Sequence, residues 1–491
     1  MQSTSKTRNP LDLTGDDFAT MMAEIVPELS AFLDRLPESG ISFPSGATQF
    51  LNQNADVALQ PPAEHPRPLR ELLDVIVQAA ENDINTPSGR ALAFIPGSGL
   101  VSSAAADLIA GVFNRYTALS VVSPAMVALE AEVLRWLATL MGLPETSGGL
   151  LTSGASMAIF SAVICARNRL PENFLSGVVY TTDQTHHCLS KAMRLAGFPS
   201  TALRLVPTDD RWRMNVRALR AMIAEDRAAG YIPLCIAVNA GTTNTGTIDP
   251  LNDIAAVAQE EDLWFHVDAA YGGFFQLTDR GKNRLSGIEH ADSIALDFHK
   301  GMFLPFGTGC LLVRDREILH RTHSDLSVPH IFRDLHGHDS NDVYLPDFGE
   351  ISPELTRPNR GLRVWLPLHL HGVAAFREAL DEKLNLAEHV YHALQKLPQI
   401  QVLAEPELSV VAFYCRGANG SQAEEDIATE ELVRYVNWEG RVYLATTRIH
   451  GRTVARIAIL NVRTTAATIK DVLNMINTYI EEAHSIHAAL T

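Results

Sequence analysis

The sequence lacks several features that mark particular classes of protein. Its five cysteines are widely spaced and include no Cys-x-x-Cys pair, which argues against a disulfide framework or a zinc site. No uninterrupted apolar run approaches the length needed to span a membrane, and the first ten residues have no apolar signal core. We therefore expect a cytoplasmic protein with reduced, buried thiols, no metal and no membrane partner.

Basic residues are also fewer than acidic ones. The chain has 40 Lys and Arg against 57 Asp and Glu, a formal net charge of −17, so a nucleic-acid partner is not expected. An anionic ligand would need a local basic pocket. With 46% hydrophobic and 20% charged residues in 491 positions, the composition is that of a globular protein of two or three packed domains.

Apolar periodicity divides the chain into three parts. Residues 11–36 and 69–80 have the spacing of amphipathic helices, which should pack on the body of the protein or on a second subunit. From about 99 to 313, short strands alternate with helices, which predicts a mostly parallel sheet covered on both faces. A charged segment at 314–359 is long enough for an active-site loop. We place an N-terminal helical dimerisation segment at 1–98, a large cofactor-binding α/β domain at 99–375 and a small α+β domain at 376–491.

Lys300 and Asp268 are the most informative residues, because each closes a strand-like run. Lys300 ends the run at 291–300, and Asp268 ends a buried-strand pattern at 264–268. Pyridoxal phosphate needs a lysine that forms a Schiff base and a carboxylate that keeps a proton on the pyridine nitrogen. Taken alone, Lys300 is more simply an ordinary lysine after a strand.

Three further strand ends carry polar groups. Residues 150–158 pass through a glycine turn into a helix, which suits a phosphate cradle or a plain helix cap. His186, at a strand-to-helix junction, could cover a pyridine ring and move protons, or be structural. Thr243 lies in a hydroxyl-rich loop, whose hydroxyl groups could contact a cofactor or could simply stabilise a turn. Because ligands gather at the carboxyl ends of strands in α/β sheets, the five ends together favour one phosphorylated aldehyde cofactor.

With the segments 123–136 and 452–465, these motifs resemble the group II pyridoxal-phosphate-dependent amino-acid decarboxylases. That family includes aromatic-amino-acid, glutamate, histidine and diaminobutyrate decarboxylases. The resemblance runs from about residue 69 to the C-terminus. It implies the fold type I architecture of pyridoxal-phosphate-dependent transferases, with a seven-stranded type of sheet in the large domain. It also implies a homodimer whose active sites are shared across the interface.

The resemblance assigns roles to individual residues. Lys300 would form the Schiff base, Asp268 would pair with the pyridinium nitrogen, and His186 would stack on the ring. Further residues are implied by position: Ala155, Ser156, His299 and Asp297 around the phosphate, Thr243 and Ala270 along the ring, and Arg456, Arg360, Phe94, Ile95 and Pro96 on the substrate side. Asp297 stands where many animal members have asparagine, and a carboxylate is less suited to an anion.

The implied reaction is α-decarboxylation of an L-amino acid to the amine and carbon dioxide. His330 occupies the loop position where the family usually has a proton-donating tyrosine, and Tyr344 lies further along the same loop. Histidine can donate a proton, so decarboxylation is still expected. Loss of that tyrosine is also associated with oxygen-consuming aldehyde synthesis, which is the alternative reaction. A non-catalytic interaction protein on the same scaffold is a third hypothesis, and the substrate side chain stays open.

Overall fold

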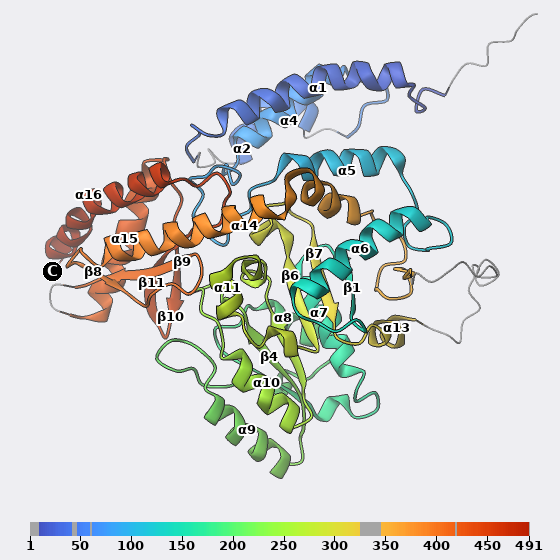
Figure 1. Ribbon diagram of the computed structural model, residues 1–491. Helices are drawn as coiled ribbons and strands as arrows, with labels where there is room; N and C mark the ends of the chain where they lie inside the picture. Colours follow the sequence, from blue (N-terminus) through green and yellow to red (C-terminus); the bar gives the residue numbers. More distant parts are fainter. Residues whose placement is uncertain (1–8, 42–46, 59–60, 325–344, 418–419, 491) are drawn as a thin grey trace, which may run out of the picture.

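The computed structural model in Figure 1 describes residues 9–41, 47–58, 61–324, 345–417 and 420–490. Its centre is a seven-stranded sheet in the order β1-β7-β6-β5-β4-β2-β3. Within this sheet β7 runs antiparallel to both neighbours, and the other strands are mutually parallel. The strands are β1 (Gly148–Thr152), β2 (Gly177–Thr181), β3 (Leu203–Leu205), β4 (Ile232–Asn239), β5 (Trp264–Asp268), β6 (Ser293–Asp297) and β7 (Gly309–Val313).

Helices surround this sheet, as Figure 1 shows. β2, β6 and β7 are buried at every residue, as expected for strands covered on both faces. α7 packs closely on β6 and β7 because much of its buried side is alanine. The predicted α/β fold with a mostly parallel sheet is confirmed. The helices are α6 (Pro124–Leu140), α7 (Ala155–Arg167), α8 (Cys188–Leu195), α9 (Val216–Ala228), α10 (Leu251–Glu260), α11 (Asp279–Arg284), α12 (Phe298–Gly301) and α13 (Glu317–His323).

The C-terminal part has its own core, in which an antiparallel sheet of order β10-β11-β9-β8 packs on α15, and α16 packs on α15 and α14. The long helix α14 (Gly361–Leu394) connects it to the large sheet and bends at Gly372, where φ is 75°. The domain boundary expected after residue 375 falls inside α14, just past this bend, and stays a prediction. The remaining elements are β8 (Ile400–Val402), β9 (Val410–Cys415), α15 (Gln422–Trp438), β10 (Ala445–Ile449), β11 (Arg452–Ala458) and α16 (Ala466–Leu490).

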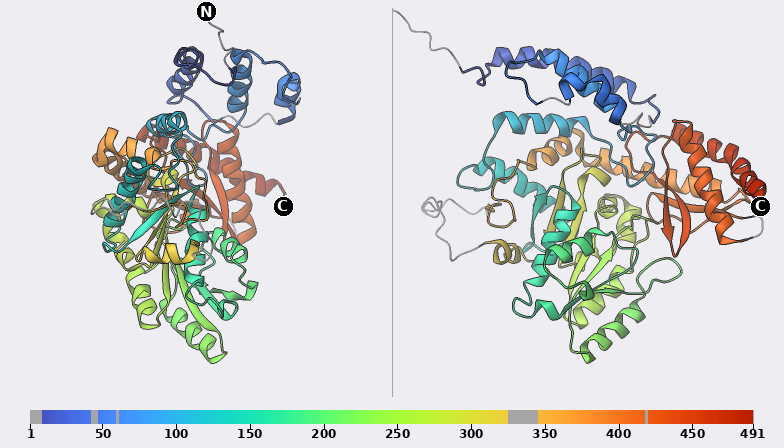
Figure 2. Two further views of the ribbon diagram at one scale, coloured as in Figure 1. Left: turned by 90° about the vertical axis from the view of Figure 1, so that its right-hand side faces the viewer. Right: turned by 180° about the vertical axis from the view of Figure 1, so that it is seen from behind.

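The two amphipathic helices predicted at the N-terminus are confirmed as α1 (Gly15–Arg35) and α4 (Leu69–Glu81). Both views of Figure 2 place them side by side in a layer beyond α5 (Val101–Phe113), and Arg70 of α4 pairs with Glu28 of α1 at 2.6 Å. Neither helix has a buried residue, so their apolar faces stay largely uncovered in the single chain. The short helices α2 (Ala47–Gln53) and α3 (Ala55–Ala58) lie between them in sequence.

The cysteines are buried and unpaired, as predicted. Burial raises the pKa of Cys165 and Cys415 to about 12, so both stay protonated thiols at neutral pH. In the described ranges no helix combines the length and apolar character required to cross a membrane. The same ranges contain no group of three or more His, Cys, Asp or Glu side chains arranged to hold a metal ion.

Candidate active site

The five predicted strand ends meet in one cavity of about 200 Å³ at the carboxyl edge of the parallel strands. All nine residues predicted to contact the cofactor line it: Ala155, Ser156, His186, Thr243, Asp268, Ala270, Asp297, His299 and Lys300. Its walls are completed by five residues that the motifs did not assign: Ile159, Cys188, Asn239, Gly241 and Tyr271.

A glycine in β7 allows two walls of the cavity to approach each other. Gly309 lies in register with Thr152 of β1 on one side and with Asp297 of β6 on the other. A Cβ atom at Gly309 would lie 2.4 Å from the carbonyl carbon of Gly154 and 2.6 Å from the nitrogen of Ala155. The absence of this Cβ lets the N-terminus of α7 lie against the end of β6, where the N–H of Ala155 reaches Asp297 Oδ2 at 3.5 Å.

Lys300 lies in the single helical turn α12, which directly follows β6. The backbone N–H of Phe298 donates to the carbonyl of Thr308 and ties this turn to the start of β7. Lys300 Nζ is 4.0 Å from Asp297 Oδ2, and His299 Nδ1 is 2.7 Å from Asp297 Oδ1. An amine, an imidazole and a carboxylate therefore share one end of the cavity.

Asp268 is the last residue of β5, and its position is fixed by the backbone around it. Its Oδ1 accepts a hydrogen bond from the N–H of Ala270 at 3.1 Å. Its main-chain carbonyl accepts from the N–H of Ala240 at 2.9 Å, which continues the β4–β5 pairing. A carboxylate held in this way can keep a facing ring nitrogen protonated without moving.

His186 is a neutral imidazole in this site. Its Nδ1 accepts from the N–H of Cys188 at 3.3 Å, so the neutral ring carries its proton on Nε2. Burial lowers the pKa of His186, the Asp268 carboxylate raises it, and His187 and Lys300 lower it again, with a net lowering. An uncharged ring is suited to cover an aromatic cofactor, and its stacking role stays a prediction.

A buried carboxylate shapes the loop that carries Thr243. Asp249 Oδ2 accepts from the backbone N–H of Asn239 at 2.7 Å and from its side-chain amide at 3.0 Å. The same amide donates to Thr185 Oγ1 at 3.0 Å, next to His186. These contacts join the end of β4 to the segment before α8, and so fix Thr243 and His186 relative to each other.

Arg456 reaches this loop from β11 of the C-terminal sheet and is only 3% exposed. Its Nε donates to the carbonyl of Asn244 at 3.0 Å, and its Nη2 donates to the carbonyls of Phe94, at 3.1 Å, and Thr243. Burial lowers the pKa of Arg456 to about 10. No carboxylate among the described residues pairs with it, so a buried cation lies directly behind the cavity wall.

The predicted substrate-side segment contributes one exposed side chain. Phe94 is 60% exposed, has a φ of 56° and packs edge-on against Tyr443 at a ring distance of 5.8 Å. Ile95 and Pro96 are buried. A positive φ in a non-glycine residue is strained, and here it turns the Phe94 carbonyl toward Arg456.

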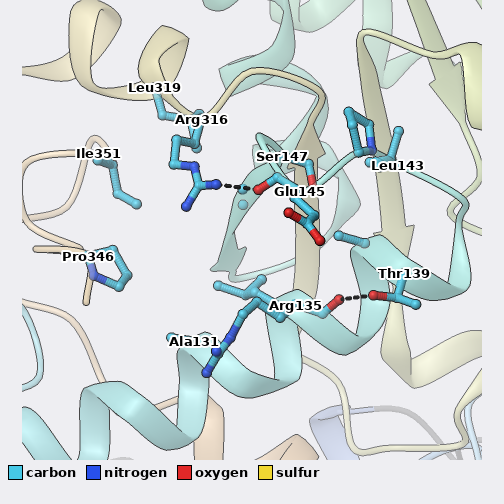
Figure 3. Close-up of a pocket in the computed structure, with 15 residues that line it drawn as sticks. Ala131, Arg135, Thr139, Leu143, Glu145, Ser147, Arg316, Leu319, Pro346 and Ile351 are labelled. Atoms are coloured by element: carbon cyan, nitrogen blue, oxygen red, sulfur yellow. Dashed lines mark hydrogen bonds between the residues drawn. The ribbon is translucent and has the colours of Figure 1, made fainter. Parts of the chain in front are cut away.

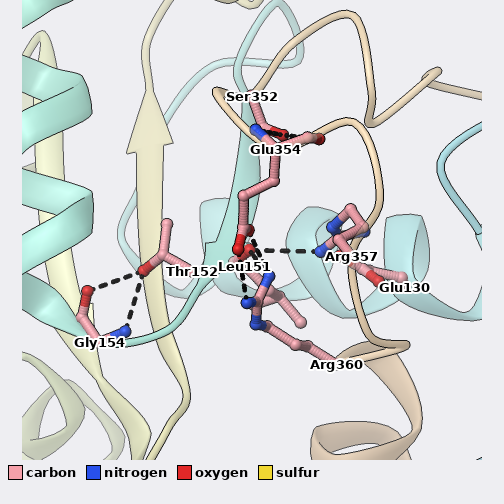
Figure 4. A network of polar contacts seen from close by, with 8 residues as sticks. All are labelled: Glu130, Leu151, Thr152, Gly154, Ser352, Glu354, Arg357 and Arg360. Atoms are coloured by element: carbon pink, nitrogen blue, oxygen red, sulfur yellow. Dashed lines mark hydrogen bonds and ion pairs between the residues drawn. The ribbon is translucent and has the colours of Figure 1, made fainter.

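Arg360 does not line the cavity and instead forms part of a polar network, drawn in Figure 4. Its Nη1 and Nη2 donate to the two carboxylate oxygens of Glu354 at 2.7 and 3.0 Å. Arg357 beside it pairs with the buried Glu130 at 2.5 Å and donates to the carbonyl of Leu151 at 3.2 Å. The network fastens the segment before α14 to β1. A substrate role for Arg360 stays a prediction.

His330 and Tyr344, the two candidates for the proton donor, lie outside the described residues.

Tyr271 is the clearest site residue that the motifs did not assign. It follows Ala270, and its hydroxyl accepts from the N–H of Ser409 at 2.8 Å and contacts Ser409 Oγ at 2.9 Å. Burial raises its pKa to about 12. Its neighbour Ala270 was the available signal, but only the turn after β5 brings the Tyr271 hydroxyl to Ser409, just before β9.

A second cavity of about 440 Å³, shown in Figure 3, lies at the opposite end of β1. Apolar residues of α6, together with Leu319, Pro346 and Ile351, form much of its wall, and Arg316 and Glu145 lie at its side. None of the predicted site residues lines it. The larger empty space is therefore separate from the cavity that contains Lys300.

The chemistry of the smaller cavity fits pyridoxal phosphate. The N–H of Ala155 at the start of α7, with Ser156 and His299, would supply donors for a phosphate at one end. Asp268 would supply the carboxylate for the ring nitrogen, and Lys300 the amine for the aldehyde. These donors, the carboxylate and the amine are the groups that this cofactor requires, and they line a single cavity.

Comparison with known proteins agrees with this arrangement. Residues 59–416 match the family model for the pyridoxal-dependent decarboxylase conserved domain, a span that contains the whole cavity. The aromatic-L-amino-acid decarboxylase of Bacillus atrophaeus is 34% identical over 393 residues, which are 80% of this chain and 81% of that protein. The phenylacetaldehyde synthase of Petunia hybrida is 27% identical over 462 residues, which are 89% and 88% of the two chains.

The fold matches that of Catharanthus roseus tryptophan decarboxylase, solved in complex with L-tryptophan, with a TM-score of 0.84. The match covers 96% of this chain and 99% of that one at 24% identity, a level that bears on the fold alone. The shared fold includes both the large sheet and the C-terminal sheet.

Proposed function

Because the chain belongs to the pyridoxal-dependent decarboxylases, we propose that it removes the α-carboxylate of an L-amino acid and releases the amine and carbon dioxide. The observation that carries this proposal is the convergence of Lys300, Asp268 and His186 in one cavity, with the buried cation of Arg456 behind its wall. A cationic group that has no acidic partner in the described chain suits the carboxylate of an amino acid.

Each of these residues has a distinct task in the proposed reaction. When bound, pyridoxal phosphate supplies a ring that accepts the electrons left behind by the departing carboxylate. Lys300 holds the cofactor through its amine, and Asp268 keeps the ring nitrogen protonated. The neutral imidazole of His186 covers the ring and excludes water from it. Arg456 orients the substrate, and His330 or Tyr344, in the segment 325–344, returns a proton.

Substitution of Lys300 tests the proposal. K300A is expected to lose both the visible absorbance of the bound cofactor and the release of carbon dioxide, because no other lysine lines the described cavity. K282A, which removes an exposed lysine of α11, is the matched control and should behave as wild type. Carbon dioxide release by K300A at the wild-type rate would exclude this site. Aromatic, acidic and diamino L-amino acids form the substrate panel.

Oxygen-consuming aldehyde synthesis is the second candidate. His330 in place of a tyrosine favours it, and so does the likeness to a phenylacetaldehyde synthase. An aldehyde synthase would consume oxygen and form ammonia and peroxide, whereas a decarboxylase would form the amine without oxygen. Measurement of oxygen uptake together with the aldehyde, ammonia, peroxide and amine formed in the same assay separates the two reactions. The variant H330Y should shift an aldehyde synthase toward the amine.

A homodimer with shared active sites is part of the proposal. The uncovered apolar faces of α1 and α4, and exposed side chains on α5 such as Leu108, Ile109 and Val112, support it because a second copy would bury them. Light scattering across a range of protein concentrations gives the oligomeric state. The cytoplasmic location expected from the sequence stays a prediction.

A further inference from the structure

Asp297 places a carboxylate at the end of the cavity that has to receive a phosphate. It is the last residue of β6 and is only 4% exposed. Its Oδ1 lies 2.7 Å from His299 Nδ1, and its Oδ2 accepts from the N–H of Ala155 at 3.5 Å. Lys300 Nζ is 4.0 Å from the same Oδ2. Asp297 therefore contacts the groups expected to meet the cofactor's phosphate and aldehyde.

The positive charge available to a phosphate here is small. The basic side chains that line the described cavity are His186, His299 and Lys300, and no arginine is among them. The amine of Lys300 is needed at the aldehyde end, so His299 and the N-terminus of α7 are left for the phosphate. Asp297 already contacts both. An arriving phosphate thus meets groups whose positive charge is offset by a carboxylate a few ångströms away, and like charges at that distance repel strongly.

We propose that Asp297 is an internal counter-anion of the phosphate subsite. In the cofactor-free protein its carboxylate lies against the N–H of Ala155, at 3.5 Å, and against His299 Nδ1, at 2.7 Å without hydrogen-bond geometry, and the cofactor's phosphate competes with it for this position. This inference rests on the cofactor of the proposed function. It predicts that Asp297 weakens the binding of phosphate but does not affect ligands without one.

The same contacts are also consistent with the opposite effect, in which Asp297 strengthens phosphate binding. The test has to distinguish the two effects. If Asp297 mainly holds His299 in the orientation that binds phosphate, its removal would weaken phosphate binding. The sign of the change in affinity therefore decides between competition and positioning.

The test uses the full-length protein freed of cofactor, with binding measured by calorimetry. D297N and D297A are titrated with inorganic phosphate, pyridoxal phosphate and pyridoxine, which has neither the phosphate nor the aldehyde that would react with Lys300. Competition predicts that both variants bind the two phosphate ligands at least about tenfold more tightly, about 1.4 kcal/mol, and bind pyridoxine as wild type does. D253N, which neutralises an exposed carboxylate of α10 away from the cavity, is the control and should match wild type.

Two variants are needed because asparagine brings a new donor and alanine does not. Tighter phosphate binding by D297N alone would be caused by the new amide donor and would overturn the proposal. Unchanged or weaker phosphate binding by both variants would also overturn it. If D297A does not fold, D297V, which likewise brings no donor, replaces it. Tighter phosphate binding by both D297N and D297V is then the expected result.

These measurements need no turnover. A protein that released no carbon dioxide could still show the effect of Asp297 on phosphate, whereas active D297N and D297A with unchanged phosphate affinity would refute this inference alone. Failure of the proposed reaction and failure of the counter-anion are therefore distinguishable.

Discussion

Replacement of Arg456 by lysine tests whether the buried cation meets the substrate. In the structure Nε and Nη2 of Arg456 donate hydrogen bonds to the carbonyls of Phe94, Thr243 and Asn244. Nη1 has no partner among the described residues, so it is the nitrogen available to a substrate carboxylate. Lysine keeps the charge but cannot satisfy the carbonyls and reach the carboxylate at once, because its donors share one nitrogen.

The expected size of the effect follows from one lost hydrogen bond. A hydrogen bond to a charged group contributes about 1.5–3 kcal/mol, which corresponds to roughly a 10- to 100-fold change in kcat/KM. Because the carboxylate is bound before it leaves, most of the change should be a higher KM. R456K should also be less stable than wild type by roughly 1–3 kcal/mol, since at least one buried carbonyl loses its donor.

Arg463 provides the matched control. It is half-buried, burial lowers its pKa, and its Nη1 donates to the carbonyls of Pro87 and Ser98 without lining the cavity. R463K should lose stability and keep the wild-type KM. Steady-state kinetics and urea unfolding of both variants give the comparison. A wild-type KM in R456K, together with a loss of stability like that of R463K, would refute the substrate role and leave Arg456 a structural residue.

Three other changes have defined outcomes. D268N should retain the cofactor, seen by its visible absorbance, and lose about 100-fold or more in kcat, because an amide cannot hold a proton on the ring nitrogen; wild-type turnover would contradict this. Burial lowers the pKa of His266 to about 4. Between about pH 4 and 6.5 the unfolded chain therefore binds more protons than the folded protein. The free energy of unfolding of the wild type should fall by up to roughly 3 kcal/mol as the pH decreases through that window. Urea unfolding at both ends of the window should show a smaller fall for H266Q. G309A should cost roughly 1–3 kcal/mol in stability and weaken phosphate binding because its Cβ meets Gly154, whereas G111A, whose Cβ meets nothing within 4 Å, should not.

The order of elements predicted where the site lies, and the family resemblance named most of its residues. The strands β2, β4, β5, β6 and β7 lie between residues 99 and 313, where alternating strands and helices were expected, and all belong to the large sheet. Parallel strands joined by helices align their carboxyl ends, so residues just after successive strands are brought together whatever the details of packing. This is why all nine predicted cofactor residues line one cavity.

Residues outside that rule were harder to assign. Arg360 was predicted near the substrate and is held by Glu354, because the segment before α14 folds back onto β1. The apolar periodicity around Arg360 does not predict that contact. Tyr271 was not assigned because a turn, not a strand or helix, determines where its side chain points.

The sequence by itself determined the cofactor, because the motifs around Lys300, Asp268 and His186 lie at strand ends and together resemble the decarboxylase family. The tertiary structure decided what surrounds these groups. β7 enters between β1 and β6 against the direction of both, and its Gly309 brings Asp297 to the N–H of Ala155. Arg456 crosses from a separate sheet to the Thr243 loop, more than 200 positions away in the chain. Both contacts depend on how distant segments pack, and local periodicity carries no information about such packing.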